Sequence, residues 1–124
     1  KLKGTDRVCL ITDAIRHAGL QNCDLVKGGT QTVPYIIEDG VAKLADRSAF
    51  AGSIATADRL IRVLTKEVDV SVEDAVYMMT QVPSKIMGID SFKGKLEKGY
   101  DADIVIFDAD ITIRNVFLQG EQVV

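Results

Sequence analysis

The residue best suited to do chemistry in this sequence is Asp13, a carboxylate that directly follows the short apolar run Val8–Thr12. A continuous apolar run is typical of a buried parallel strand, because both faces of such a sheet are covered. In α/β barrels the chemistry lies at the C-terminal ends of the strands. Asp13 is therefore a candidate general base, which would take a proton from a metal-bound water and return it to a leaving amine. The alternative is that Asp13 only ends the strand or begins a turn.

A second candidate segment is Phe50-Ala51-Gly52-Ser53, which opens a helical pattern. The free N–H groups at the start of a helix can bind an anion or a substrate oxygen. The simpler interpretation is that Ser53 is an ordinary N-cap.

Histidine and cysteine, two of the common metal ligands, are sparse in the sequence. His17 is the only histidine, and it lies in a glycine-flanked stretch where a solvated surface position is the simpler interpretation. The sequence contains no His-x-His pair, no cysteine pair at metal spacing and no glycine-rich phosphate loop. We therefore expect this chain alone to hold no metal.

The composition restricts the class of partner. The 124 residues carry 15 basic and 18 acidic side chains, for a net charge of −3, and the basic residues form no cluster. This pattern argues against nucleic acid or an anionic membrane as a partner. No apolar run approaches the roughly 18 residues of a membrane span, and no signal-peptide pattern opens the chain, so we expect a cytoplasmic protein.

Elements follow from the periodicity and the turn residues. After the strand at 8–12, a loop is predicted over residues 13–29. Two β-rich runs separated by Glu38-Asp39-Gly40 predict a hairpin. Helices are predicted from Ile54, from Ser71 and around Pro83, with a stop at Gly88. Ser71 and Asp74 resemble a capping box, with Ser71 as the N-cap. The remaining runs predict strands at 32–37, 41–44, 102–107, 111–118 and 122–124.

The segment 94–108 carries a family resemblance. Its sequence, Gly-Lys-Leu-Glu-Lys-Gly-Tyr-Asp-Ala-Asp-Ile-Val-Ile-Phe-Asp, resembles the pattern G-x-(I/L)-x-x-G-x-x-A-D-(I/L)-V of the amidohydrolase superfamily. In that superfamily the pattern marks the small β-sandwich at the C-terminal end. The resemblance is specific to the superfamily and not to one substrate.

Other stretches resemble the N-acetylglucosamine-6-phosphate deacetylases within that superfamily. They are Leu10–Ala14 followed by Ala18–Leu20, Lys43–Asp46 leading to Phe50–Ser53 and Asp58-Arg59, and Pro83–Gly88. The resemblance implies that Asp13 ends the eighth barrel strand and acts first as general base and then as general acid. It also implies that Phe50, Ala51 and Gly52 contact the amino-sugar phosphate substrate. Departures from the family pattern occur at Ala57, at Val82 and at Ile15-Arg16-His17.

The resemblance implies an α/β fold: the C-terminal fragment of a (β/α)₈ amidohydrolase barrel, with its last strand, a hairpin and helices, plus strands of the β-sandwich. We expect residues 1–88 to belong to the barrel domain and residues 89–124 to the sandwich. A complete barrel needs about 250 residues. We therefore expect the divalent metal, zinc or similar, to be held in the full-length enzyme by earlier strands. The chain alone is then inactive, and a homo-oligomer would cover its apolar faces. The alternatives are another amidohydrolase, of dihydropyrimidinase or deaminase type, and a non-catalytic interaction module.

Overall fold

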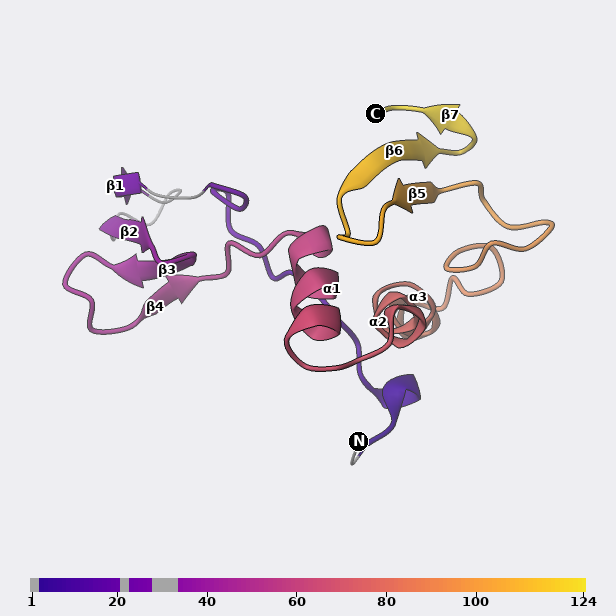
Figure 1. Cartoon of the computed structure of the whole chain (residues 1–124), viewed down its shortest axis with the longest axis horizontal. Coiled ribbons are helices and arrows are strands. Elements are labelled where there is room, and N and C mark those ends of the chain that lie inside the picture. The colour runs from indigo at the N-terminus through magenta and orange to yellow at the C-terminus, as the bar shows by residue number, and fades with distance from the viewer. Residues whose placement is uncertain (1–2, 21–22, 28–33) are drawn as a thin grey trace. The chain divides into compact units, whose positions relative to one another are not determined.

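The computed structural model describes residues 3–20, 23–27 and 34–124, and for 23–27 it describes the backbone. The chain divides into two compact units (Figure 1). The smaller unit is Thr12–Ala57, and the larger one combines Lys1–Ile11 with Asp58–Val124. The domain boundary expected after residue 88 falls inside the larger unit. The assignment of residues 1–88 to a barrel domain and of residues 89–124 to a sandwich domain stays a prediction.

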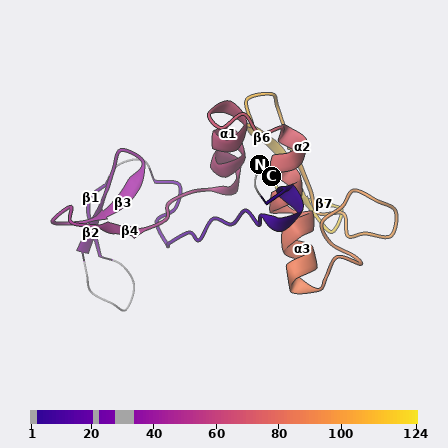
Figure 2. The same ribbon diagram turned by 90° about the horizontal axis from the view of Figure 1, so that it is seen from below.

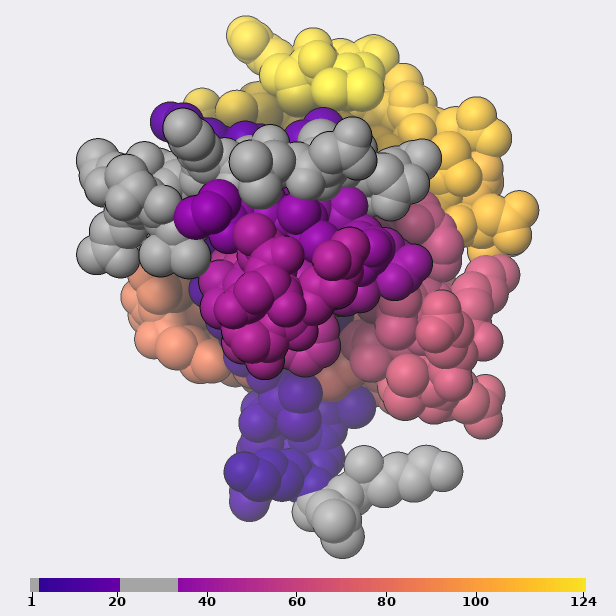
Figure 3. Space-filling model, turned by 90° about the vertical axis from the view of Figure 1, so that its left-hand side faces the viewer, coloured from indigo at the N-terminus to yellow at the C-terminus, as the bar shows by residue number. Residues whose placement is uncertain are grey.

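The smaller unit is built on an antiparallel sheet in the order β1-β2-β3-β4. Its strands are β1 (Cys23–Lys27), β2 (Pro34–Glu38), β3 (Val41–Leu44) and β4 (Phe50–Gly52). Tyr35, Ile37, Ala42 and Ile54 form its buried core, and Ile15 and Ala51 pack against them. Figure 3 shows the purple-to-magenta residues of this hairpin region gathered into one continuous surface.

The predicted hairpin between β2 and β3 is confirmed for the described residues, while positions 32 and 33 lie outside them. Asp39 and Gly40 both have positive φ, 53° and 73°. This is the turn geometry that matches the twist of the two strands. Glu38 binds Lys43 at 3.2 Å and Arg47 at 3.1 Å across the turn. The loop expected over 13–29 is wrong at 23–27, because these residues pair with β2.

The strand predicted over Val8–Thr12 does not form. The segment is extended, but in the described part of the chain its only ladder contact is a single parallel bridge just beyond it, at Ala14. The Leu10 amide donates instead to the Met78 carbonyl, and Ile11 is 64% exposed. A buried parallel strand requires neighbouring strands and a cover on both faces, and this segment has neither in the described residues.

Three helical segments follow in the larger unit: α1 (Ala57–Lys66), α2 (Val72–Met79) and α3 (Gln81–Met87), after a 3₁₀ turn, η1 (Thr5–Arg7). The Ser71 hydroxyl accepts a hydrogen bond from the Asp74 amide at 3.1 Å, which confirms the predicted N-cap. Gly88 ends α3 with a φ of 69°, as predicted. Figure 2 shows α3 continuing almost in line with α2. The prediction of a helix starting at Ile54 is wrong by three residues.

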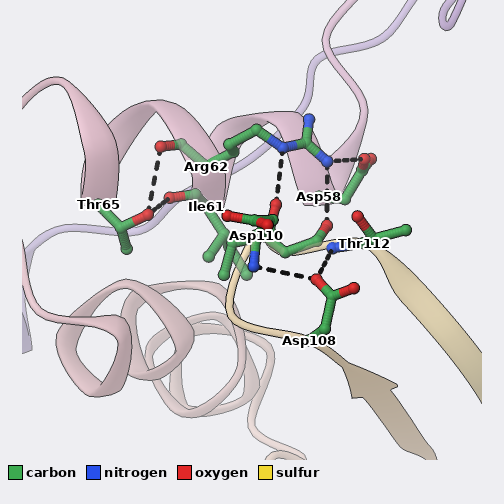
Figure 4. Close-up of polar contacts among 8 residues, drawn as sticks. Asp58, Ile61, Arg62, Thr65, Asp108, Asp110 and Thr112 are labelled. Carbon is green, nitrogen blue, oxygen red and sulfur yellow. Dashed lines mark hydrogen bonds and ion pairs between the residues drawn. The ribbon is translucent and has the colours of Figure 1, made fainter.

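A second antiparallel sheet completes the larger unit, with β5 (Ile104–Phe107), β6 (Ile113–Leu118) and β7 (Glu121–Gln122) in that order. The loop between β5 and β6 is fastened to α1 (Figure 4). The Arg62 guanidinium donates to the carbonyls of Asp110 and Ile111 at 3.2 and 3.0 Å. These contacts hold Ile111, 2% exposed and at a φ of 59°, in the core beside Ile61 and Ala75. The chain therefore has the mixed helix and strand content that was expected.

Candidate functional site

Asp13 lies in the smaller unit, at the point where the extended segment meets the sheet. Its φ of 46° is left-handed, a conformation that aspartate tolerates better than most residues with a side chain. The residue is exposed, and in the described part of the chain its carboxylate has no hydrogen-bond or ion-pair partner. An unpaired carboxylate open to solvent is free to accept a proton.

The segment after Asp13 is attached to the end of β4. Ala14 forms a parallel bridge with Ser53, and the Ile15 amide donates to the Ser53 carbonyl at 2.9 Å. Paired backbones lie about 4.8 Å apart. The two stretches that were singled out separately in the sequence, Asp13 and Phe50–Gly52, are thus neighbours in the fold.

Phe50, Ala51 and Gly52 form strand β4, which pairs with β3. Phe50 is 77% exposed, whereas Ala51 packs against the core of the smaller unit. Gly52 has a φ of 134°, and a Cβ built on it would lie 2.6 Å from Ile15 Cγ2. Only glycine allows the Asp13 segment and β4 to approach this closely.

The interpretation of Phe50–Ser53 as a helix start is wrong. Helix α1 begins at Ala57, so the free N–H groups of its first turn lie beyond this segment. The N-cap interpretation of Ser53 is also wrong, because its hydroxyl accepts from the Ala55 amide at 3.2 Å in a local turn ahead of the helix. Residues 48–53 are mostly small, and this composition does not distinguish a short strand from the segment that precedes a helix.

The turn that leads into β4 is shaped by Asp46. Its carboxylate accepts hydrogen bonds from the Ser48 hydroxyl at 2.7 Å and from the Ser48 amide at 3.0 Å. These bonds stabilise the charged form, and they hold the pKa of Asp46 below its ordinary value of 3.8. The Leu44 amide then donates to the Ala49 carbonyl at 2.9 Å, which closes the turn.

His17 is not the solvated surface residue that the sequence suggests. It is half-buried, and its Nδ1 is hydrogen-bonded to the hydroxyl of Tyr35 on β2. The two rings meet edge to face, with centroids 5.8 Å apart. Tyr35 lies 18 residues away along the chain, so no local sequence signal marks the pair.

The described residues do not form a metal centre. They contain no group of three or more His, Cys, Asp or Glu side chains placed to hold an ion. Among the same residues no helix is long and apolar enough to cross a membrane. The carboxylate of Asp13 and strand β4 are thus the candidate site that this chain presents.

Comparison with known proteins decides the family. The model of the amidohydrolase family matches residues 5–123, nearly the whole chain. The chain belongs to the amidohydrolase family. The match confirms the superfamily resemblance that segment 94–108 indicated in this amidohydrolase chain.

The individual relatives that the chain is similar to include several N-acetylglucosamine-6-phosphate deacetylases. The chain is 34% identical to an N-acetylglucosamine-6-phosphate deacetylase of Caenorhabditis elegans, over 92% of this chain and 27% of that protein. Its fold is similar to a deacetylase of the same name from Thermotoga maritima, with a TM-score of 0.84, 25% identity, and coverage of 98% of this chain and 32% of that one.

A further solved structure is an aspartate-to-alanine mutant of the Mycobacterium smegmatis N-acetyl-D-glucosamine-6-phosphate deacetylase in complex with N-acetyl-D-glucosamine-6-phosphate. It gives a TM-score of 0.79 and 27% identity, over 98% of this chain and 32% of that one. The resemblance read from the sequence to these deacetylases is thus confirmed. The amidohydrolase chain spans about 30% of the length of these three relatives.

Proposed function

We propose that this chain supplies the acid–base group of an N-acetylglucosamine-6-phosphate deacetylase. The reaction is hydrolysis of the N-acetyl group, which yields glucosamine 6-phosphate and acetate. The similarity to deacetylases of that name supports the substrate class. The observation that carries the proposal is the bridge between Ala14 and Ser53, since it brings an unpaired carboxylate beside β4.

In the proposed reaction Asp13 acts twice. Its carboxylate first accepts a proton from the water whose oxygen adds to the acetamide carbonyl carbon. The protonated Asp13 then donates this proton to the amide nitrogen as the C–N bond breaks. The nitrogen leaves as the amine of glucosamine 6-phosphate, the acyl group leaves as acetate, and Asp13 returns to its starting charge.

Strand β4 is proposed to contact the sugar. The exposed ring of Phe50 offers an apolar surface to the C–H face of a pyranose. Gly52 is exposed and carries no side chain of its own, so it contributes its backbone groups. Ala51 contributes through its backbone, since its side chain packs inward.

A divalent cation, zinc or similar, is proposed for the complete enzyme, in which it would polarise the acyl group and its attacking water. The described residues do not fit such an ion, because no three or more of their carboxylate, histidine or cysteine side chains are placed to hold one. We propose that the ion is held by other parts of the complete enzyme, outside the segment that this chain represents. We also propose that the complete enzyme is cytoplasmic and that it forms a homo-oligomer.

The decisive experiment measures acetate release from N-acetylglucosamine 6-phosphate by the full-length protein that carries this sequence, supplied with Zn²⁺. Asp13→Asn is expected to lower kcat by about 10²- to 10⁴-fold, the usual contribution of a general acid–base group. Asp6→Asn is the matched control, since Asp6 is also an exposed aspartate, and is expected to leave kcat unchanged. Near-normal turnover by Asp13→Asn overturns the role of Asp13.

A substrate panel tests the class of reaction. N-acetylgalactosamine 6-phosphate, the 4-epimer, is the close competitor, and a dihydropyrimidine represents the other amidohydrolases. Preference for the dihydropyrimidine refutes the proposed function. Hydrolysis of no substrate at all by the metal-loaded protein favours a non-catalytic module. Acetate production by the 124-residue chain alone contradicts the proposal that the ion is held elsewhere.

A further inference from the structure

The turn after Asp13 is attached by hydrogen bonds to two consecutive residues that directly follow β4. The Ile15 amide donates to the Ser53 carbonyl at 2.9 Å, and the Gly19 amide donates to the Ile54 carbonyl at 3.2 Å. Between these two anchors the Ala18 amide donates to the Ile15 carbonyl at 3.0 Å. Residues 15–19 therefore form a compact turn whose base is held on one side only, by the segment that leaves β4.

His17 lies at the tip of this turn and supplies a third anchor, on a different strand. Its partner Tyr35 is 6% exposed and belongs to the core of the smaller unit. Tyr35 is opposite Leu44 in the pairing of β2 with β3, so its position is fixed by the sheet. The contact combines a hydrogen bond with an edge-to-face ring contact, and it joins the tip of the turn to β2.

Asp13 depends on this turn for its position. The described residues offer its carboxylate no partner, so the position from which the side chain reaches out is fixed by the backbone and not by a side-chain contact. That backbone has a left-handed φ of 46°, which costs about 1 to 2 kcal/mol for most residues with a Cβ and less for aspartate, so contacts on the neighbouring turn favour its retention. Catalytic geometry tolerates errors of about 0.5 Å.

We infer that His17, through its contact with Tyr35, is a positioning residue for Asp13. The inference rests on the proposed function of Asp13 and adds a residue to that site. His17 touches neither substrate nor metal in this role. It holds the turn so that the carboxylate of Asp13 meets the attacking water at the same place in each turnover.

The test compares kcat and KM for acetate release by the full-length protein. Tyr35→Phe removes one hydroxyl and keeps the buried ring, and His17→Leu removes the hydrogen-bonding ring nitrogen. Each is expected to lower kcat about tenfold with KM within twofold of the parent, because misplacement of the base affects the chemical step and not substrate binding. His17→Asn retains a polar atom near the Nδ1 position and is expected to restore most of kcat.

Tyr100→Phe is the matched control, because it removes a tyrosine hydroxyl that donates to the Asp90 carbonyl in the larger unit. It is expected to leave kcat unchanged. In the Asp13→Asn background, Tyr35→Phe is expected to cause no further loss of the residual rate, since the group that is positioned is already absent.

The outcomes separate the two proposals. If Asp13→Asn abolishes turnover while Tyr35→Phe lowers only the unfolding midpoint and leaves kcat unchanged, the positioning role is overturned and the proposed function stands. If Asp13→Asn retains turnover, the proposed function fails and the positioning role fails with it. Should His17→Leu not fold, Tyr35→Phe decides the question by itself, since its packing volume is almost that of the parent.

Discussion

Gly52→Ala tests the close approach between the Asp13 segment and β4. At a φ of 134° the backbone of Gly52 lies in a region that is essentially closed to residues with a Cβ. The added methyl group would also stand 2.6 Å from Ile15 Cγ2. The substitution therefore introduces backbone strain and a steric clash at the same point.

Both costs can be estimated from the geometry. The backbone strain is about 1 to 3 kcal/mol. The contact is roughly 1 Å shorter than the ~3.5 Å at which two carbon atoms pack favourably, and forcing such overlap into a packed site costs about 1 to 3 kcal/mol. Together these give a loss of about 2 to 6 kcal/mol in the free energy of unfolding of the smaller unit.

Urea denaturation followed by circular dichroism measures this loss, and amide exchange at Ile15 reports it locally, because that amide is bonded to the Ser53 carbonyl. Gly88→Ala is the matched control. Gly88 has a φ of 69°, and among the described residues no atom beyond its immediate chain neighbours and the adjoining helix backbone lies within 4 Å of an added Cβ. It is expected to cost about 1 kcal/mol, from left-handed backbone alone.

Ile15→Ala removes the methyl group that causes the clash. In the double mutant with Gly52→Ala, the combined loss is expected to be smaller than the sum of the single losses by about 1 to 3 kcal/mol. The reasoning is refuted if Gly52→Ala costs no more than Gly88→Ala, or if the two substitutions at the contact are additive.

Two further predictions concern the elements that support the site. Hydrogen bonds from Arg47 and then Lys43 lower the pKa of Glu38 from 4.5 to about 2. A lowered folded-state pKa means that this stabilisation is complete above pH 4.5 and is lost as the pH falls towards 2. Between pH 4.5 and 2, the free energy of unfolding is expected to fall less for Glu38→Gln than for the parent, as measured by acid unfolding followed by circular dichroism. Ser71→Ala removes the hydroxyl that accepts from the Asp74 amide at the start of α2. It is expected to lower the free energy of unfolding by about 1 kcal/mol, measured by urea titration, whereas Ser71→Asp is expected to preserve it.

The features predicted correctly from the sequence are those that depend on near neighbours. The β2–β3 turn at Asp39-Gly40, the N-cap at Ser71 and the stop at Gly88 each follow from the conformational preferences of a few consecutive residues. The family resemblance was likewise readable from short motifs, and Asp13 and Phe50–Gly52 were singled out in this way.

Tertiary structure decided the rest. The segment Val8–Thr12 has the composition of a buried strand, but strand formation needs a neighbouring backbone, and Leu10 bonds to Met78 instead. The adjacency of Asp13 to β4 and the contact of His17 with Tyr35 join residues 18 or more positions apart. Composition and periodicity describe one segment at a time, so they identified the groups that could do chemistry. Only the packing of distant segments determined which of those groups lie together.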